Sequence, residues 1–211
     1  MPGNAKMYSG LLIVIFILLL TDSKAQDRKF SLGVKGGPNV STYLGDLHGS
    51  NAVISYHVGI YSRFYKSNST EYWQMEVLYS EKGSRYDDYI VDVKQTLTYI
   101  DVPVLYHFVK ETGNGFIIGP QVSVFLDSEN EMLYQKGHAY IHMMEIHDNN
   151  AFRPIDIGIV GGFIFSIEDL IRIEGRMGLG LTNFVNNSVL DREEKLKGRI
   201  ANVQLSVGLN Y

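Results

Sequence analysis

Apolar and polar residues alternate along most of the chain from about residue 29 onward. The clearest case lies between residues 100 and 108, where Val102, Val104 and Tyr106 share one face while Asp101 and His107 share the other. A repeat of two residues indicates a β-strand whose two faces meet different surroundings. We expect eight such strands, at residues 29–40, 52–64, 71–82, 96–109, 116–126, 152–166, 169–182 and 198–211.

The connections between these strands fall into two classes that alternate along the chain. Short turns are expected at 66–70, 110–115 and 167–168. The long polar connections are 41–51, 83–95, 127–151 and 183–197. Short turns on one rim and long loops on the other are typical of outer-membrane barrels, with both chain ends on the short-turn, periplasmic side. The pattern therefore predicts an all-β fold, an eight-stranded antiparallel up-and-down transmembrane β-barrel.

Aromatic residues mark the short-turn end of most of the predicted strands, on the apolar face. Such a ring is one of the two aromatic girdles expected where a barrel meets the lipid headgroups. The residues of this girdle are Phe30, Phe64, Trp73, Phe108, Phe116, Phe165 and Tyr211. For the opposite girdle the candidates are Tyr56, Tyr79 and Phe152.

The other face of the strands carries glycine and charges of both signs. Opposed charges and small residues can fill a narrow polar lumen, so we expect a plugged interior. A soluble lipocalin-like barrel, with the apolar face inside, is the alternative. The girdle, the loop asymmetry and a strand that ends on the last residue favour the membrane barrel. The charged residues expected to face the lumen are Lys35, Arg63, Glu76, Asp101, Asp156, Arg172, Glu174 and Arg176.

Two prolines, Pro103 and Pro120, fall inside predicted strands. Proline has no N–H to donate to a sheet ladder and usually marks an edge or a bulge. A closed barrel has no edge, so we expect a local bulge near residues 101–103.

The first 25 residues have the pattern of a secretory signal peptide. Lys6 supplies a positive charge, and residues 11–20 form an unbroken apolar run of ten. Small residues at Ser23 and Ala25 predict cleavage before Gln26. The run is shorter than the roughly 20 residues of a membrane-spanning helix; a buried core helix or uncleaved anchor is the alternative. We expect a signal peptide at 1–25, a barrel domain at 26–211 and location in the cell outer membrane.

Composition narrows the possible chemistry. There is no cysteine, which excludes disulfides and thiolate metal sites. The net charge of −4 includes no basic cluster, which argues against nucleic acid as a partner.

Three histidines, His138, His142 and His147, lie close together in the third long loop, beside Glu145 and Asp148. Imidazole and carboxylate groups suit Zn²⁺, but no four-ligand spacing is present. A polar surface loop is the simpler interpretation, and we assign no metal site and no cofactor.

An enzyme acting on lipids would need a nucleophile and a base near one rim. Ser55, His57, Ser80, Asp101 and His107 carry suitable groups. No motif fixes their mutual geometry, and a nucleophile must lie within hydrogen-bond reach of its base. We therefore assign no catalytic residue.

Five segments in order resemble the PorT-like family of outer-membrane β-barrel proteins. They are Gly33–Asn39, Glu76–Gly83, Tyr99–Val104, Gly119–Val122 and Gly178–Asn183. The resemblance covers almost all of the chain after the signal peptide and implies an eight-stranded barrel in the outer membrane. The named member of the family is linked to type IX protein secretion, although the matching motifs are architectural.

The sequence thus favours a monomeric, non-enzymatic barrel, a structural or accessory part of the cell envelope with a link to type IX-like secretion. Outer-membrane lipid and secretion or envelope proteins are the expected partners. A lipid-modifying barrel enzyme and a transporter for small solutes or hydrophobic compounds are the alternatives. Eight strands enclose an interior that side chains nearly fill, which argues against an open pore.

Overall fold

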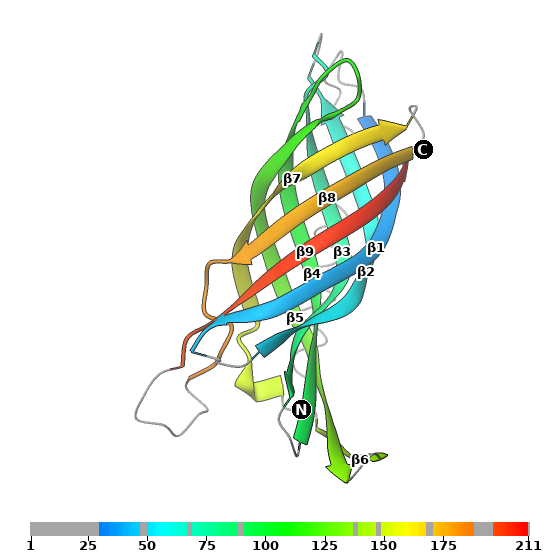
Figure 1. Ribbon diagram of the computed structural model, residues 1–211. Helices are drawn as coiled ribbons and strands as arrows, with labels where there is room; N and C mark the ends of the chain where they lie inside the picture. Colours follow the sequence, from blue (N-terminus) through cyan, green and yellow to red (C-terminus); the bar gives the residue numbers. More distant parts are fainter. Residues whose placement is uncertain are drawn as a thin grey trace.

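Eight antiparallel strands close into a barrel, and a ninth extends the wall beyond one rim (Figure 1). The structure is a computed structural model that describes residues 30–46, 50–66, 69–87, 91–136, 139–146, 149–167, 171–187 and 196–210. The predicted signal peptide and its cleavage site before Gln26 lie outside these residues. The strands are β1 (Phe30–Gly45), β2 (Ser50–Tyr65), β3 (Tyr72–Asp87), β4 (Val91–Val109), β5 (Gly115–Lys136), β6 (Ala139–Ile146), β7 (Ile155–Ile167), β8 (Ile171–Gly180) and β9 (Gly198–Asn210).

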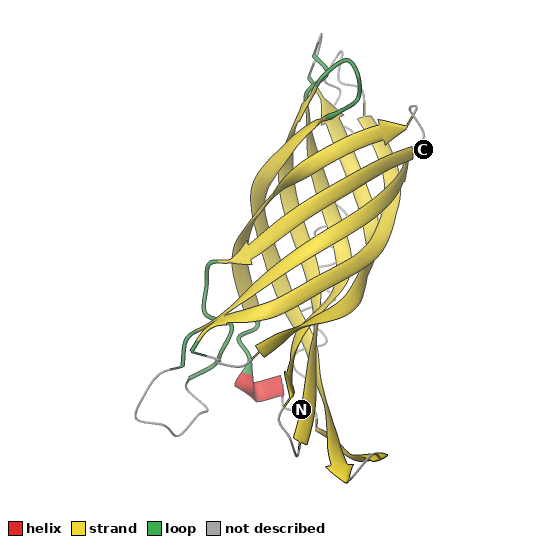
Figure 2. Cartoon of the chain, viewed as in Figure 1, coloured by secondary structure: helices red, strands yellow, loops and turns green. Residues whose placement is uncertain are grey.

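The order of the strands around the wall is β4-β3-β2-β1-β9-β8-β7-β5, and pairing of β4 with β5 closes the barrel. Every pairing is antiparallel, which confirms the predicted fold class. A single 3₁₀ turn, η1 (Asn149–Ala151), is the only helical element in the described part of the chain, as Figure 2 shows. No helix of that part is long and apolar enough to cross a membrane.

Several strands run farther toward the long-loop rim than the sequence predicted. Most of the segments 83–95 and 127–151, expected as loops, is paired strand belonging to β3, β4, β5 and β6. Polar cross-strand pairs hold these extensions together, including Lys94 with Glu131 at 3.5 Å (Nζ to Oε2) and Arg85 with Asp92. In these extensions polar residues lie on both faces, with Ser84, Asp92 and Ser128 buried while Arg85 and Glu129 are exposed. The alternation of apolar and polar residues that marks the membrane segment therefore disappears there.

The predicted facing of the strands is confirmed. Asp101, Leu105 and His107 on β4 are fully buried inside, whereas Phe108 is 46% exposed on the outside. Six of the seven predicted girdle aromatics are exposed at the short-turn rim, and the seventh, Tyr211, lies outside the described residues. Neighbouring rings touch across strands, as Phe30 and Phe64 do with centroids 5.4 Å apart. The apolar face is therefore the outer face of the barrel.

The opposite girdle is only partly as predicted. Tyr56 and Tyr79 lie on the outer face and stack with ring centroids 6.0 Å apart. Phe152 was assigned wrongly: it precedes β7, is 8% exposed and packs among buried aromatic residues inside the long-loop rim. An aromatic residue at a strand end packs inward when an irregular segment folds over the barrel mouth.

The bulge predicted near residues 101–103 does not lie at Pro103 itself. The register between β3 and β4 is the same on both sides of Pro103. A shift occurs earlier, between Thr98 and Tyr99, where β5 contributes the extra residue Leu126. Pro103 therefore removes a donor from one ladder without adding a residue to the strand.

A side chain inside the barrel stabilises the seam between the first and last strands. A Cβ placed on Gly33 of β1 would lie 2.2 Å from Cζ of Tyr61, so only glycine allows this ring to cross β1. The Tyr61 hydroxyl, which belongs to β2, donates a hydrogen bond of 3.0 Å to the carbonyl oxygen of Leu209 on β9. One side chain thus links three successive strands across the seam.

Candidate functional site

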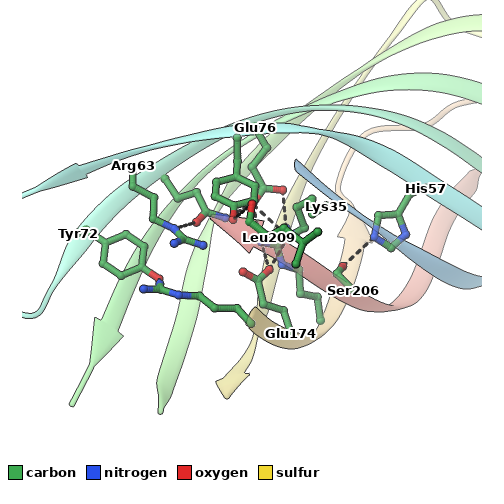
Figure 3. A network of polar contacts seen from close by, with 12 residues as sticks. Lys35, His57, Arg63, Tyr72, Glu76, Glu174, Ser206 and Leu209 are labelled. Carbon is green, nitrogen blue, oxygen red and sulfur yellow. Dashed lines mark hydrogen bonds and ion pairs between the residues drawn. The ribbon is translucent and has the colours of Figure 1, made fainter. Parts of the chain in front are cut away.

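The polar interior of the barrel is the candidate functional site. Lys35 from β1, Glu76 from β3, and Glu174 and Arg176 from β8 meet inside the wall, and we call these four residues the central charge cluster (Figure 3). Each of the four side chains is at most 4% exposed. Alternation along the strands places all four on the inward face.

The guanidinium of Arg176 joins the two carboxylates of this cluster. Its Nη1 donates to Oε2 of Glu76 at 2.7 Å, and its Nη2 donates to the other oxygen of Glu76 and to Glu174. Lys35 Nζ donates to the same two carboxylates, at 3.3 Å for Glu76. Two acids and two bases therefore neutralise one another, which is the condition for burying charge.

A hydrogen-bonded chain leads from this cluster toward the short-turn rim. The Gln74 side chain donates to Glu76 and accepts a bond of 2.7 Å from Nε of Arg63. The guanidinium of Arg63 lies 5.3 Å from the ring centre of Tyr72, and Arg172 donates to the Tyr72 hydroxyl. Stacking on an aromatic face suits a guanidinium in a confined space.

A second buried ion pair lies farther toward the long-loop rim. Lys82 Nζ donates to Oδ1 of Asp101 at 2.7 Å and to Oγ of Ser123 at 3.3 Å. Lys82 was not among the charged residues predicted to face the lumen, because it is the last residue of a predicted strand. It is an even number of residues from Glu76 on that strand and therefore faces the same way. Of the eight predicted inward charges, seven are buried and Arg172 is half-buried.

Apolar layers close the interior at both ends. Near the short-turn rim, Tyr72, Val109, Ile117 and Ile164 pack together. The layer near the long-loop rim, which we call the outer apolar cap, consists of Tyr43, Leu97, Tyr99, Phe125, Phe152, Phe184, Val185 and Ile200. Phe152 and Phe184 come from irregular segments and stack with centroids 6.0 Å apart. The central charge cluster and the Lys82–Asp101 pair thus lie between these two layers.

The five candidate residues for catalysis are all described, and no hydrogen bond joins any two of them, although His57 and Ser80 lie opposite each other on β2 and β3. His57 Nε2 lies 2.7 Å from Oγ of Ser206, a residue that the sequence analysis did not single out. The other ring nitrogen of His57 has no hydrogen-bond partner among the described residues, and the side chain is 1% exposed. Ser55 donates to the backbone oxygen of Glu81 at 2.6 Å, and His107 stacks on Tyr72 at 4.4 Å. A buried serine–histidine pair without an orienting carboxylate does not form a catalytic triad.

The histidine-rich segment cannot be placed as a site. His138 and His147 lie outside the described residues, and His142 belongs to β6 with its side chain outside the description. Among the residues that are described, no group of three or more His, Asp or Glu side chains is arranged to hold a metal ion.

Known proteins share this architecture. The family model of the outer membrane protein beta-barrel domain matches residues 23–186. No curated protein matches the sequence. Among solved structures, Neisserial surface protein A (NspA) superposes with a TM-score of 0.50 and 12% identity, over 88% of this chain and 100% of that one. Ail, the attachment invasion locus protein of Yersinia pestis, gives a TM-score of 0.48 and 8% identity, over 87% and 99%.

Proposed function

Because the chain belongs to the outer membrane protein beta-barrel domain family, we propose that it is a non-conducting, non-enzymatic component of the cell envelope. In this proposal residues 1–25 direct export and are removed, and residues 26–211 form a monomeric barrel. The barrel anchors the extended β3–β6 wall on the outer side of the membrane. Its role is structural or accessory, and no residue performs chemistry.

The observation that carries this proposal is the filled interior. The central charge cluster and the Lys82–Asp101 pair lie between two apolar layers. A polar cavity of about 10 Å³ beside Lys82 and Asp156 has room for about one water molecule. Hydrophilic solutes would have to break buried ion pairs in order to pass.

Planar-bilayer recording of the pure protein tests the closed interior. We expect no stable conductance above that of the bare bilayer, because buried ion pairs and apolar side chains occupy the interior. A large, steady and ion-selective current would instead show an open pore and would support the transporter alternative.

A link to type IX-like secretion rests on the resemblance to the PorT-like family, in segments such as Tyr99–Val104. Crosslinking in intact envelopes followed by purification tests this accessory role. Subunits of a secretion machine should be recovered with the wild-type barrel. A deletion strain with chemically altered lipid A would point instead to the lipid-modifying enzyme.

A further inference from the structure

A shallow apolar groove crosses the outer wall of the barrel over β7, β8, β9 and β1, which lie side by side in Figure 1. Its volume is about 950 Å³. Gly161, Gly175 and Ala201 are its smallest residues, while Phe163 and Met177 are among the bulky residues around them. The groove lies within the belt of exposed apolar side chains that marks the lipid-facing surface.

The strand register explains the shape of the groove. Gly161 of β7 pairs with Met177 of β8, and Gly175 of β8 pairs with Phe163 of β7. Each glycine therefore has a bulky cross-strand neighbour. Ala201 of β9 lies nearer the long-loop rim, between Thr42 of β1 and Leu179 of β8, and Met177 lies between it and the two glycines. The floor is backbone and small side chains, and the walls are large apolar side chains.

Packing within the chain does not account for the two glycines. A Cβ added at Gly162 would lie 2.2 Å from a backbone oxygen, so glycine is needed there. At Gly175 an added Cβ would meet no atom within 4 Å, and at Gly161 the nearest atom is 3.8 Å away. Glycine weakens a strand because it is flexible and has no side chain to pack. Its presence at two outward positions leaves a depression that faces the membrane.

Positive charge lies at the long-loop end of the groove. Arg199 of β9 pairs with Leu44 of β1, two residues along the strand from Ala201 and on the same outward face. The Arg199 side chain is exposed and forms no hydrogen bond or ion pair with any described residue. Lys197 nearby is exposed too, and its backbone N–H donates a hydrogen bond of 2.9 Å to Oδ2 of Asp46, so one carboxylate lies beside these two cations. Long loops face the outside in this class of barrel, so these cations lie at the level of the outer-leaflet headgroups.

We propose that the groove binds an anionic acylated lipid of the outer leaflet, with an acyl chain along Gly161, Gly175 and Ala201 and a phosphate at Arg199. The groove is continuous with the lipid-facing belt, so an acyl chain enters it without leaving the bilayer. A flexible acyl chain can lie in a depression between large side chains and make close contacts with them. The convex wall of a second copy of the barrel cannot enter the depression in this way. This lipid site goes beyond the structural role proposed above and is independent of it.

Native mass spectrometry of the full chain, released from a neutral detergent, tests the site. The probes are phosphorylated lipid A and the same lipid A with its phosphates removed. Wild-type protein should retain the phosphorylated form preferentially. Filling the floor with Gly161→Leu and Gly175→Leu should weaken retention of both forms by roughly tenfold, since the acyl chain loses its closest contacts. Val104→Leu, on the outer face of β4 away from the groove, should leave retention unchanged.

The charge is tested separately. Arg199→Gln should abolish the preference for the phosphorylated lipid while the dephosphorylated form binds as before. Folding of each variant is checked by its heat-dependent mobility in gels, and the single variant Gly175→Leu repeats the test if the double variant fails to fold. Unchanged lipid retention by a folded, filled variant would overturn the proposal. Dimerisation of the wild-type protein that is lost in the filled variant would also overturn the proposal, because the groove would then be an interface between two copies.

Discussion

Arg176 makes three hydrogen bonds to the buried carboxylates, one more than Lys35 makes to the same two acids. Its guanidinium contacts both Glu76 and Glu174, and Lys35 supplies the only other cation in that cluster. Without Arg176, two buried carboxylates would share one ammonium group. Burying an unbalanced charge costs far more than an apolar replacement of the whole cluster would, because the remaining ions keep their desolvation penalty.

We therefore expect Arg176→Met to lower the free energy of unfolding by roughly 3–5 kcal/mol. A urea titration of the protein folded in lipid vesicles measures this change. The matched control is Lys94→Met, because the Lys94–Glu131 pair is about 40% exposed on both sides. Exposed pairs contribute about 0–1 kcal/mol, so the control should unfold almost as the wild type does. Equal costs for the two variants would contradict the assignment of Arg176 to a dry interior.

Strand β4 shows both environments of the wall within two neighbouring residues. Val104 faces lipid, and Leu105 is fully buried inside. Val104→Arg should destabilise the folded barrel by roughly 2–4 kcal/mol if the residue lies near the bilayer midplane. Leu105→Gln should cost less, because the lumen already holds polar groups that can accept its amide. Folding titrations of both variants into vesicles compare them, and the reverse order would mean that the barrel is inside out.

The elements that sequence could predict are those in which lipid and lumen impose different side chains. This difference defined all eight wall strands and their facing, including Asp101 and His107 on β4. The extensions of β3, β4 and β5 could not be predicted, since polar residues lie on both of their faces and give no alternation. Strand β6 lies in a segment that was expected to be a loop. Pro103 suggested a bulge, but loss of one donor was tolerated without a change of register.

Three layers close the interior: the outer apolar cap, the buried ion pairs and the short-turn apolar layer. Phe184 is central to the cap, where it is 1% exposed and contacts Tyr43 at 4.8 Å between ring centres. Phe184→Ala should lower stability by about 3–5 kcal/mol, as for other buried aromatic residues.

The same variant should remain silent in planar bilayers, because the ion pairs below the cap are intact. A conductance that appears in Phe184→Ala but not in the wild type would mean that the cap alone closes the barrel. A loss of less than about 1 kcal/mol would show that the segment carrying Phe184 is not packed as described.

The sequence predicted which charged residues the candidate site contains, but not which of them are in contact. The alternation along each strand identified the charged residues that face the lumen. Which of them form ion pairs depends on how far each strand is staggered against the next. Glu76 and Arg176 are 100 residues apart in sequence and meet only because the barrel closes. Lys82 and Ser206 also lie at inward-facing positions of their strands. The alternation alone does not show which inward-facing residues contact one another.

The seam fastened by Tyr61 also constrains the order of events during biogenesis. β1 is synthesised first, but its second partner is the last strand, since Gly33 pairs with Asn210. Until β9 arrives, the free edge of β1 cannot rest in hydrocarbon, where each unpaired backbone group costs several kcal/mol. Tyr61 likewise has no carbonyl of Leu209 to bond. The nascent chain must therefore be kept out of the bilayer core until its final segment is available, and insertion and closure then occur together.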